Sequence, residues 1–249
     1  MNGDTALLAC SGLETSIVVT SVTWRSRQGL TFARLSPRVV AGQIDSAARQ
    51  HIQACTIGSL SSPEIVRVVM QRLKRRSVPN LVLHPAIFSH EGDRILSHEG
   101  VVRLRKFLPG LACLVADLPN ARALAPGPST PPTDPPASRE IPPGSQGEQD
   151  AAEVARRLVH AGVPFAIVRI GGPGGIDIVY DGMAMQTRPS CKGLHASSGS
   201  MAAAIAGGMA RGLPAPQAYD EACRGCWHLE PSLPFPPTFH TALQGEENA

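Results

Sequence analysis

The sequence predicts an α/β fold with a mainly parallel sheet and helices on both faces. Short apolar segments rich in β-branched residues alternate along the chain with longer amphipathic segments. Continuous apolar strands indicate a sheet that is buried on both faces, which is typical of parallel strands joined by helices. The chain has 249 residues, of which 43% are hydrophobic and only 4% aromatic, so we expect a core of mainly aliphatic side chains.

The first half of the chain alternates strand-like and helix-like segments. Ser16–Trp24 is rich in β-branched residues and predicts a buried strand. Ser62 is a suitable N-cap, Pro63 fits the first turn of a helix, and Glu64 lies at its positive end. The elements that follow the first strand are predicted as helix Ser36–Gln50, strand Ala54–Leu60, helix Pro63–Arg76, strand Leu81–His84, helix Val101–Leu108 and strand Ala112–Asp117.

The pattern is interrupted by a proline-rich segment and then resumes. Ala125–Gln149 contains eight prolines and almost nothing to bury, which indicates a flexible insert. We expect one domain in two parts, residues 1–124 and 150–229, with the insert at 125–149 between them and an irregular tail at 230–249. The second part is predicted as helix Asp150–Ala161, strand Pro164–Ile170, a hairpin of Ile176–Tyr180 and Met183–Thr187 across Asp181-Gly182, helix Met201–Arg211 and a last helix near Gln217–Trp227.

Composition excludes several functional classes. The formal net charge of +3 is too small to indicate a nucleic-acid surface, and the basic cluster within Arg72–Arg76 is typical of a solvated helix end. No apolar run is long enough for a membrane helix, and the N-terminus has no signal-peptide pattern. Six scattered cysteines are typical of reduced thiols. We therefore expect a cytoplasmic protein that binds neither nucleic acid nor membranes.

The small-residue stretch Gly193–Gly212 is the strongest candidate for a functional site. The first N–H groups of a helix have no intrahelical partner, and the helix dipole adds positive potential there. A turn of small residues before such a helix lets a phosphate approach these amides, although an ordinary helix cap has the same composition. The candidate anion-binding residues are His195, Ala196, Ser197, Ser198 and Gly199.

Other motifs are explained more simply by structure than by chemistry. Cys223-x-x-Cys226-x-His228 lies at a helix end without a convincing fourth zinc ligand. His90 and His98 each lie in a Ser-His-Glu-Gly tetrapeptide, which is typical of polar loops or helix starts. The Gly-rich turn after Ile170 is followed by a hairpin, so it is not a dinucleotide fingerprint.

Several segments, in their chain order, carry a resemblance to one family. With this chain's segment first, the pairs are SIVVTSVTWRSRQGL and TAQNTQGV, SPRVVAGQID and PPEFVAAQID, TIGSLSSPEIV and KIGMLASAEII, VPNLVLHP and VPNVVLDP, VADLPNARAL and TPNLPEAEAL, and HASSGSMAAAIAGGMARGL and HGTGCTLSSAIAAGLAKGL. The family is that of the hydroxymethylpyrimidine and phosphomethylpyrimidine kinases of thiamine biosynthesis, in the ribokinase superfamily.

The resemblance implies a ribokinase-like three-layer sandwich and phosphoryl transfer from ATP to a pyrimidine hydroxymethyl or phosphate group. It also implies Mg²⁺ as a cofactor, a small-molecule pyrimidine as substrate and a homodimer. The family's first strand and its Gly-rich turn have no counterpart before Asp4. We therefore expect an N-terminally truncated member whose sheet lacks its first strand and has an unpaired edge.

The chain departs from the family at the catalytic position. Gly199 stands where the family has a reactive cysteine and superfamily relatives have an aspartate. Glycine has no side chain that could act as a base, so the position is degenerate. Ser200 is the nearest surrogate, but an unactivated hydroxyl is a poor base. Ser198 replaces a glycine of the family's turn, and its Cβ is expected to narrow the turn or to strain it if φ is positive.

The positions linked to metal, nucleotide and substrate also change. The family's Asn-x-x-Glu becomes Asp117-x-x-Asn120, which moves the carboxylate of the candidate magnesium site to its other end. His84 replaces the aspartate of VLDP and is a poor magnesium ligand. The remaining candidates implied by the resemblance are Arg169, Gly171 and Gly172 for the nucleotide, and Arg25, Ser59 and Ala86 for the pyrimidine.

Two functions from different classes follow from these residues. One is a kinase that uses ATP and Mg²⁺ to phosphorylate a pyrimidine. The other is a non-catalytic relative that keeps the scaffold as a ligand-binding or regulatory partner. The changed catalytic residues favour the second function, whereas the extent of the resemblance favours the kinase family.

Overall fold

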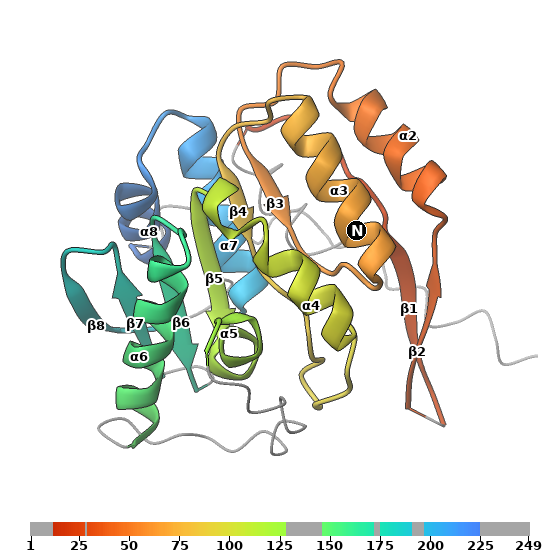
Figure 1. The fold of residues 1–249 in the computed structure, drawn as a ribbon. Coiled ribbons are helices and arrows are strands. Elements are labelled where there is room, and N and C mark those ends of the chain that lie inside the picture. Colours follow the sequence, from red (N-terminus) through yellow and green to blue (C-terminus); the bar gives the residue numbers. More distant parts are fainter. Residues whose placement is uncertain (1–11, 28, 128–145, 172–174, 191–196, 225–249) are drawn as a thin grey trace, which may run out of the picture.

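A six-stranded β-sheet lies between two layers of helices (Figure 1). The computed structural model of the chain describes residues 12–27, 29–127, 146–171, 175–190 and 197–224. The predicted α/β class, with a mainly parallel sheet and helices on both faces, is confirmed. The predictions for Gly172, His195, Ala196, most of the insert and the tail 230–249 lie outside the described residues.

The sheet has the strand order β3-β4-β5-β6-β7-β8. Its first four strands are parallel, and β7 and β8 extend it as an antiparallel hairpin beside β6. Within the described ranges β3 pairs with β4. The unpaired edge stays a prediction, because residues 1–11 lie outside the described part of the chain. The strands are β3 (Cys55–Ile57), β4 (Leu81–Leu83), β5 (Cys113–Asp117), β6 (Ala166–Ile170), β7 (Ile176–Tyr180) and β8 (Met185–Pro189).

The predicted buried strand Ser16–Trp24 is wrong in position and in burial. Residues 13–20 form no helix or strand, and β1 (Ser21–Ser26) pairs with β2 (Gly29–Arg34) in a separate antiparallel hairpin. The side chain of Gln43 bonds both main-chain groups of Val19, with both distances 2.9 Å, in place of a neighbouring strand. Composition cannot distinguish a strand of the central sheet from a strand of a separate hairpin, because β-branched residues fit any pleated strand.

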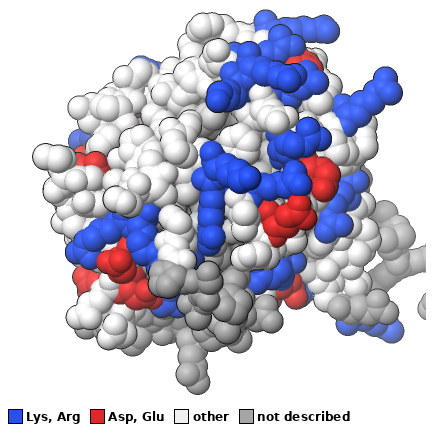
Figure 2. Space-filling model, in the orientation of Figure 1, with Lys and Arg blue, Asp and Glu red and all other residues white. Residues whose placement is uncertain are grey.

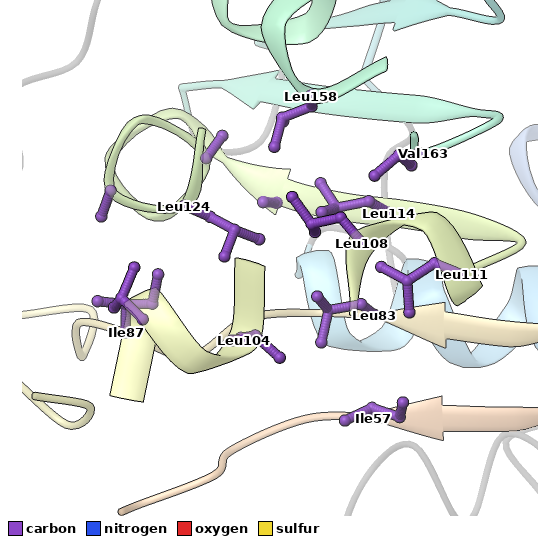
Figure 3. Close-up of a cluster of buried hydrophobic side chains, with 14 of the residues drawn as sticks. Ile57, Leu83, Ile87, Leu104, Leu108, Leu111, Leu114, Leu124, Leu158 and Val163 are labelled. Atoms are coloured by element: carbon purple, nitrogen blue, oxygen red, sulfur yellow. The ribbon is translucent and has the colours of Figure 1, made fainter. Parts of the chain in front are cut away.

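Four helices cover one face of the sheet, and a fifth, α2 (Pro37–Ala47), packs against α3 (Figure 1). Their aliphatic side chains form one buried cluster with strand residues such as Leu83 and Leu114 (Figure 3). The core is therefore aliphatic, as the composition predicted. The four helices are α3 (Pro63–Arg75), α4 (His98–Arg105), α5 (Leu118–Leu124) and α6 (Gln146–His160).

The opposite face is covered by α7 (Ser198–Ala210), which packs against α8 (Ala215–Cys223). Side chains alternate along a strand, so Leu114 of β5 packs with the first cluster while Cys113 and Val115 pack with α7. α7 is apolar on all sides, which is typical of a helix enclosed by protein.

Several helix boundaries differ from the predicted ones. α4 begins at His98 because the Ser97 hydroxyl accepts from Gly100 N, and it ends at Arg105 before a short 3-10 turn. α6 begins at Gln146, four residues before the predicted start, so the insert ends earlier than 149. The short helix α5 was not predicted, although Asp117 and Pro119 are typical N-terminal residues of a helix.

Basic side chains gather on the side of the molecule that carries α3, α4, α5 and α6, with acidic ones among them (Figure 2). Arg72 and Arg76 of the predicted basic cluster form ion pairs with Asp45 of α2, at 2.6 Å and 2.8 Å. These contacts join α2 to α3 and neutralise part of the cluster. Within the described ranges, no helix has both the length and the apolar composition to span a bilayer.

Candidate functional site

The carboxyl ends of β3, β4, β5 and β6 share one edge of the sheet with the start of α7. Parallel strands end at the same edge, where α/β proteins commonly bind ligands. β8 runs in the same direction as β6, because two antiparallel pairings separate them. The chain therefore leaves β8 at this edge, and only eight residues separate the end of β8 from the start of α7 at Ser198.

Ser197 caps the first turn of α7. Its hydroxyl accepts from Ser200 N at 3.0 Å and donates to Ser200 Oγ at 2.9 Å. The first intrahelical bond runs from Met201 N to Ser197 O at 3.1 Å, so the N–H groups of Ser198 and Gly199 precede the helical ladder. These two N–H groups and the helix dipole form the candidate anion site.

The helix begins three residues before the predicted Met201. Ser198 therefore has helical backbone, and the described non-glycine residues with positive φ are only Ser77 and Asn80. The expected strain at Ser198 is absent for this reason. Gly199 lies in the first helical turn and presents no side chain at the degenerate base position.

Asp117 and Asn120, the candidate metal pair, lie together at the carboxyl end of β5. Asn120 Nδ2 donates to Asp117 Oδ1 at 2.6 Å. Asn120 Oδ1 accepts the N–H groups of Ile87 and Phe88, both at 2.9 Å, and the residue is 4% exposed. An oxygen that accepts two N–H groups has no lone pair left for a metal, so the carboxylate of Asp117 is the cation ligand that this pair offers.

Asp117 belongs to a row of charged residues across three strands. In the sheet register Asp117 of β5 pairs with Arg169 of β6, and Arg169 pairs with Asp177 of β7. Arg169 Nε lies 3.1 Å from Asp177 Oδ1, and the two side chains are 4% and 0% exposed. Because Arg169 is engaged in this buried ion pair, its contact with a nucleotide stays a prediction. Gly171, one residue beyond β6, has a φ of +80° that suits a tight turn.

Two further groups bond the Asp177 carboxylate, and sequence reasoning missed both. Tyr219 OH of α8 donates to Oδ2 at 3.1 Å, and the Ser190 hydroxyl donates to Oδ1. The network ties α8 and the end of β8 to β6 and β7. A lone aspartate within the apolar strand IDIVY was the signal that could have revealed it.

The candidate substrate residues lie on the β1–β2 hairpin and in the loops that follow β3 and β4. Arg25 forms an ion pair with Glu91 at 2.8 Å and approaches Asp93 at 3.5 Å. Thr20, just before the hairpin, donates to the carbonyl oxygen of Ser59 at 2.8 Å. Ala86 is half-buried in the loop that follows β4. The hairpin and its stem thus contact the loops that follow β3 and β4.

His84 directly follows β4 and lies at the same edge of the sheet. Its Nδ1 lies 3.4 Å from Val115 O of the neighbouring strand. Among the described residues no group of three or more His, Cys, Asp or Glu side chains is placed to hold a metal ion.

Comparison with known proteins places this chain in a family. Residues 3–228 match the family model described as Phosphomethylpyrimidine kinase. A hydroxymethylpyrimidine/phosphomethylpyrimidine kinase of Escherichia coli K12 is 30% identical over 158 residues, which cover 63% of this chain and 54% of the relative. The chain thus spans about half the length of this curated relative. The corresponding Mycobacterium bovis protein is 29% identical, over 88% of this chain and 78% of its own.

Solved structures share the fold. Phosphomethylpyrimidine kinase from Clostridium difficile 630 superposes with a TM-score of 0.68 at 20% identity, covering 89% of this chain and 88% of its own. Pyridoxal kinase from Staphylococcus aureus in complex with ADP gives a TM-score of 0.70 at 17% identity, covering 88% and 78%. The same enzyme has been solved with pyridoxal, with a TM-score of 0.71 at 15% identity and the same coverage. By the family match over most of its length, the chain belongs to the phosphomethylpyrimidine kinase family.

Proposed function

We propose that this protein is an ATP-dependent kinase of hydroxymethylpyrimidine or its phosphate. The first turn of α7 carries the proposal, because the N–H groups of Ser198 and Gly199 lie ahead of the helical ladder at the ligand-binding edge. Phosphoryl transfer needs mainly positioning and a cradle for negative charge, and main-chain amides supply such a cradle.

The other candidate residues at this edge would hold the cation and the acceptor. Asp117 offers one carboxylate, which suits Mg²⁺ held mainly by nucleotide phosphates. Mg²⁺, when bound, would neutralise charge on the phosphate oxygens. The acceptor would lie between the hairpin and the loops after β3 and β4, near Arg25, Ser59 and Ala86. The homodimer and the cytoplasmic location stay predictions.

A second candidate is a non-catalytic relative that binds nucleotide or pyrimidine as a regulatory partner. It is favoured by Gly199, which brings no reactive side chain to the first turn of α7. Ser200 is the nearest surrogate, its hydroxyl accepts a hydrogen bond from Ser197, and a serine hydroxyl is a poor base. Loss of one well-placed catalytic group typically lowers the rate by about 10²–10⁴.

The deciding experiment measures phosphorylation of hydroxymethylpyrimidine and of its phosphate with ATP and Mg²⁺, in wild type and in Gly199→Cys. A wild-type rate of roughly 1–100 s⁻¹, usual for kinases, supports the kinase and contradicts the second candidate. Turnover only in Gly199→Cys, together with nucleotide binding by wild type, supports the non-catalytic relative. Absence of ATP, ADP and pyrimidine binding by calorimetry would contradict both.

A further inference from the structure

The side chain of Asn120 joins three segments at the carboxyl edge of the sheet. Its Oδ1 accepts the N–H groups of Ile87 and Phe88 in the loop after β4, and its Nδ2 donates to Asp117 at the end of β5. Asn120 itself lies in α5 and is 4% exposed. Three hydrogen bonds from one buried side chain therefore fix the loop, the strand end and the helix relative to one another.

These contacts require an amide rather than a carboxylate. A carboxylate accepts the two loop N–H groups equally well, but it cannot donate to Asp117. It would also place a second negative charge 2.6 Å from Asp117 Oδ1, where the amide nitrogen now lies. Relative to the family's Asn-x-x-Glu, the amide and the carboxylate have exchanged positions. The pair still contains one amide and one carboxylate, so a hydrogen bond between them is kept.

The carboxylate that Asn120 bonds lies at the same edge of the sheet as the candidate phosphate site. Val115 packs with α7, and alternation along β5 places Asp117 on the same side, at the end of the strand. The hydrogen bond from Asn120 engages Asp117 Oδ1. The second oxygen, Oδ2, has no hydrogen-bond partner among the residues that the structure describes.

We propose that Asn120 is a positioning residue, which holds the Asp117 carboxylate as the protein's ligand for the cation of a bound nucleotide. Asn120 itself does not contact the cation, because both lone pairs of its carbonyl oxygen accept main-chain N–H groups. The inference rests on the proposed function in taking a nucleotide as the source of the cation. Partners that orient a metal ligand are typically worth about 10–100-fold in metal affinity.

The test measures Mn²⁺ affinity by electron paramagnetic resonance in the presence of saturating ADP, at a temperature where circular dichroism shows every variant folded. Asn120→Ala and Asp117→Asn are each expected to weaken Mn²⁺ binding about tenfold or more. ADP affinity in EDTA is expected to change little in both. Val154→Ala, which truncates a buried residue of α6 away from the edge, is the control for general destabilisation and should bind Mn²⁺ like wild type.

The double variant Asp117→Asn/Asn120→Asp separates positioning from a purely structural role. It keeps an amide beside a carboxylate, so we expect its Tm to return to within about 2–4 °C of wild type. Its carboxylate, however, accepts the loop N–H groups and the new amide, so Mn²⁺ binding should stay as weak as in Asp117→Asn. Recovery of Mn²⁺ binding together with Tm would overturn the inference.

Two further outcomes separate this inference from the proposed function. Wild-type affinity for Mn²⁺ in folded Asn120→Ala overturns the inference and leaves the kinase proposal standing. Wild-type protein that binds no ADP, with or without Mn²⁺, overturns the proposed function and the nucleotide-borne cation with it. Hydrogen exchange then still tests the hydrogen bonds from Asn120 to the loop after β4. The main-chain amides of Ile87 and Phe88 should lose protection from exchange in Asn120→Ala and keep it in Asn120→Asp.

Discussion

Arg169 and Asp177 form an ion pair inside the sheet, with Arg169 Nε 3.1 Å from Asp177 Oδ1 and both side chains almost fully buried. They are register partners on β6 and β7. Buried charges are costly unless they are paired and hydrogen-bonded, and Tyr219 and Ser190 supply further bonds to the carboxylate. The pair therefore holds α8 and the end of β8 against the sheet, next to the strand that carries Asp117.

Asp177→Asn tests this network while preserving side-chain volume. It leaves Arg169 buried without the Asp177 charge, so we expect the free energy of unfolding to fall by about 3–5 kcal/mol. Tyr219→Phe removes a single hydrogen bond and should cost only about 1 kcal/mol. Urea unfolding followed by circular dichroism measures both, and equal stability of Asp177→Asn and wild type would contradict this role.

In the family segment TAQNTQGV the first glutamine aligns with Arg25, so Arg25→Gln restores the residue type that the resemblance implies for pyrimidine binding. The ion pair with Glu91 is exposed, so its loss should change stability by less than about 1 kcal/mol. The amide both donates and accepts, and we expect hydroxymethylpyrimidine to bind on the order of tenfold more tightly, the equivalent of one added hydrogen bond. Calorimetry measures this, with Arg67→Gln on the exposed side of α3 as control. Unchanged or weaker affinity in Arg25→Gln would exclude this position from the pyrimidine site.

Acid should weaken the contact between α2 and α3. The hydrogen bond from Arg76 is the largest of the influences that lower the pKa of Asp45 from its usual value of 3.8. A lowered pKa in the folded state contributes stability that is present above the unfolded pKa and is lost as the pH falls through the folded pKa. The urea midpoint of wild type should therefore exceed that of Asp45→Asn near neutral pH, and this difference should shrink as the pH falls below 3.8 and through the lowered pKa of Asp45. A difference that does not depend on pH would contradict an electrostatic origin.

Two glycine substitutions in helices should have opposite effects. A Cβ on Gly208 of α7 would lie 2.8 Å from Ala218 Cβ of α8, so Gly208→Ala is expected to cost about 1–3 kcal/mol through overpacking. A Cβ on Gly42 of α2 would meet nothing within 4 Å, so Gly42→Ala should stabilise the protein by about 0.5–1 kcal/mol. Thermal unfolding of both variants tests the pair. A Gly208→Ala protein as stable as wild type would show that α7 and α8 separate easily.

The sequence was sufficient to predict the sheet and most of its helices, because their patterns are local. Leu81–Leu83 and Cys113–Asp117 read as apolar strands, and Ser62 and Pro63 mark the start of α3. The first predicted strand failed, because nothing local distinguishes a β-branched hairpin from a sheet strand. The short helix α5 was missed because it has only seven residues and no long apolar period.

The candidate site residues could be named from the sequence, but their contacts could not. Alignment of Asp117 and Asn120 with a family motif identified the pair, and the structure places them in contact. The bonds from Asn120 to Ile87 and Phe88 join residues more than thirty positions apart, so no local pattern encodes them. The same holds for Tyr219 and Asp177, which are 42 residues apart in the chain.

The central claim is that main-chain N–H groups in the first turn of α7 bind a nucleotide phosphate. Ser198→Pro deletes one of these N–H groups at a position where helices tolerate proline, and the preceding residue, Ser197, has the required extended backbone with ψ of 148°. Ser198→Ala is the matched control, since it removes the hydroxyl and keeps the N–H group.

Calorimetric titration of ATP with Mg²⁺ into wild type and both variants tests the claim most directly. We predict that Ser198→Pro, still folded by circular dichroism, binds ATP about 10–100-fold more weakly, as expected for one lost hydrogen bond to a charged group. Ser198→Ala should bind within about threefold of wild type, a difference of less than about 1 kcal/mol. Equal ATP affinity of Ser198→Pro and wild type would contradict the claim.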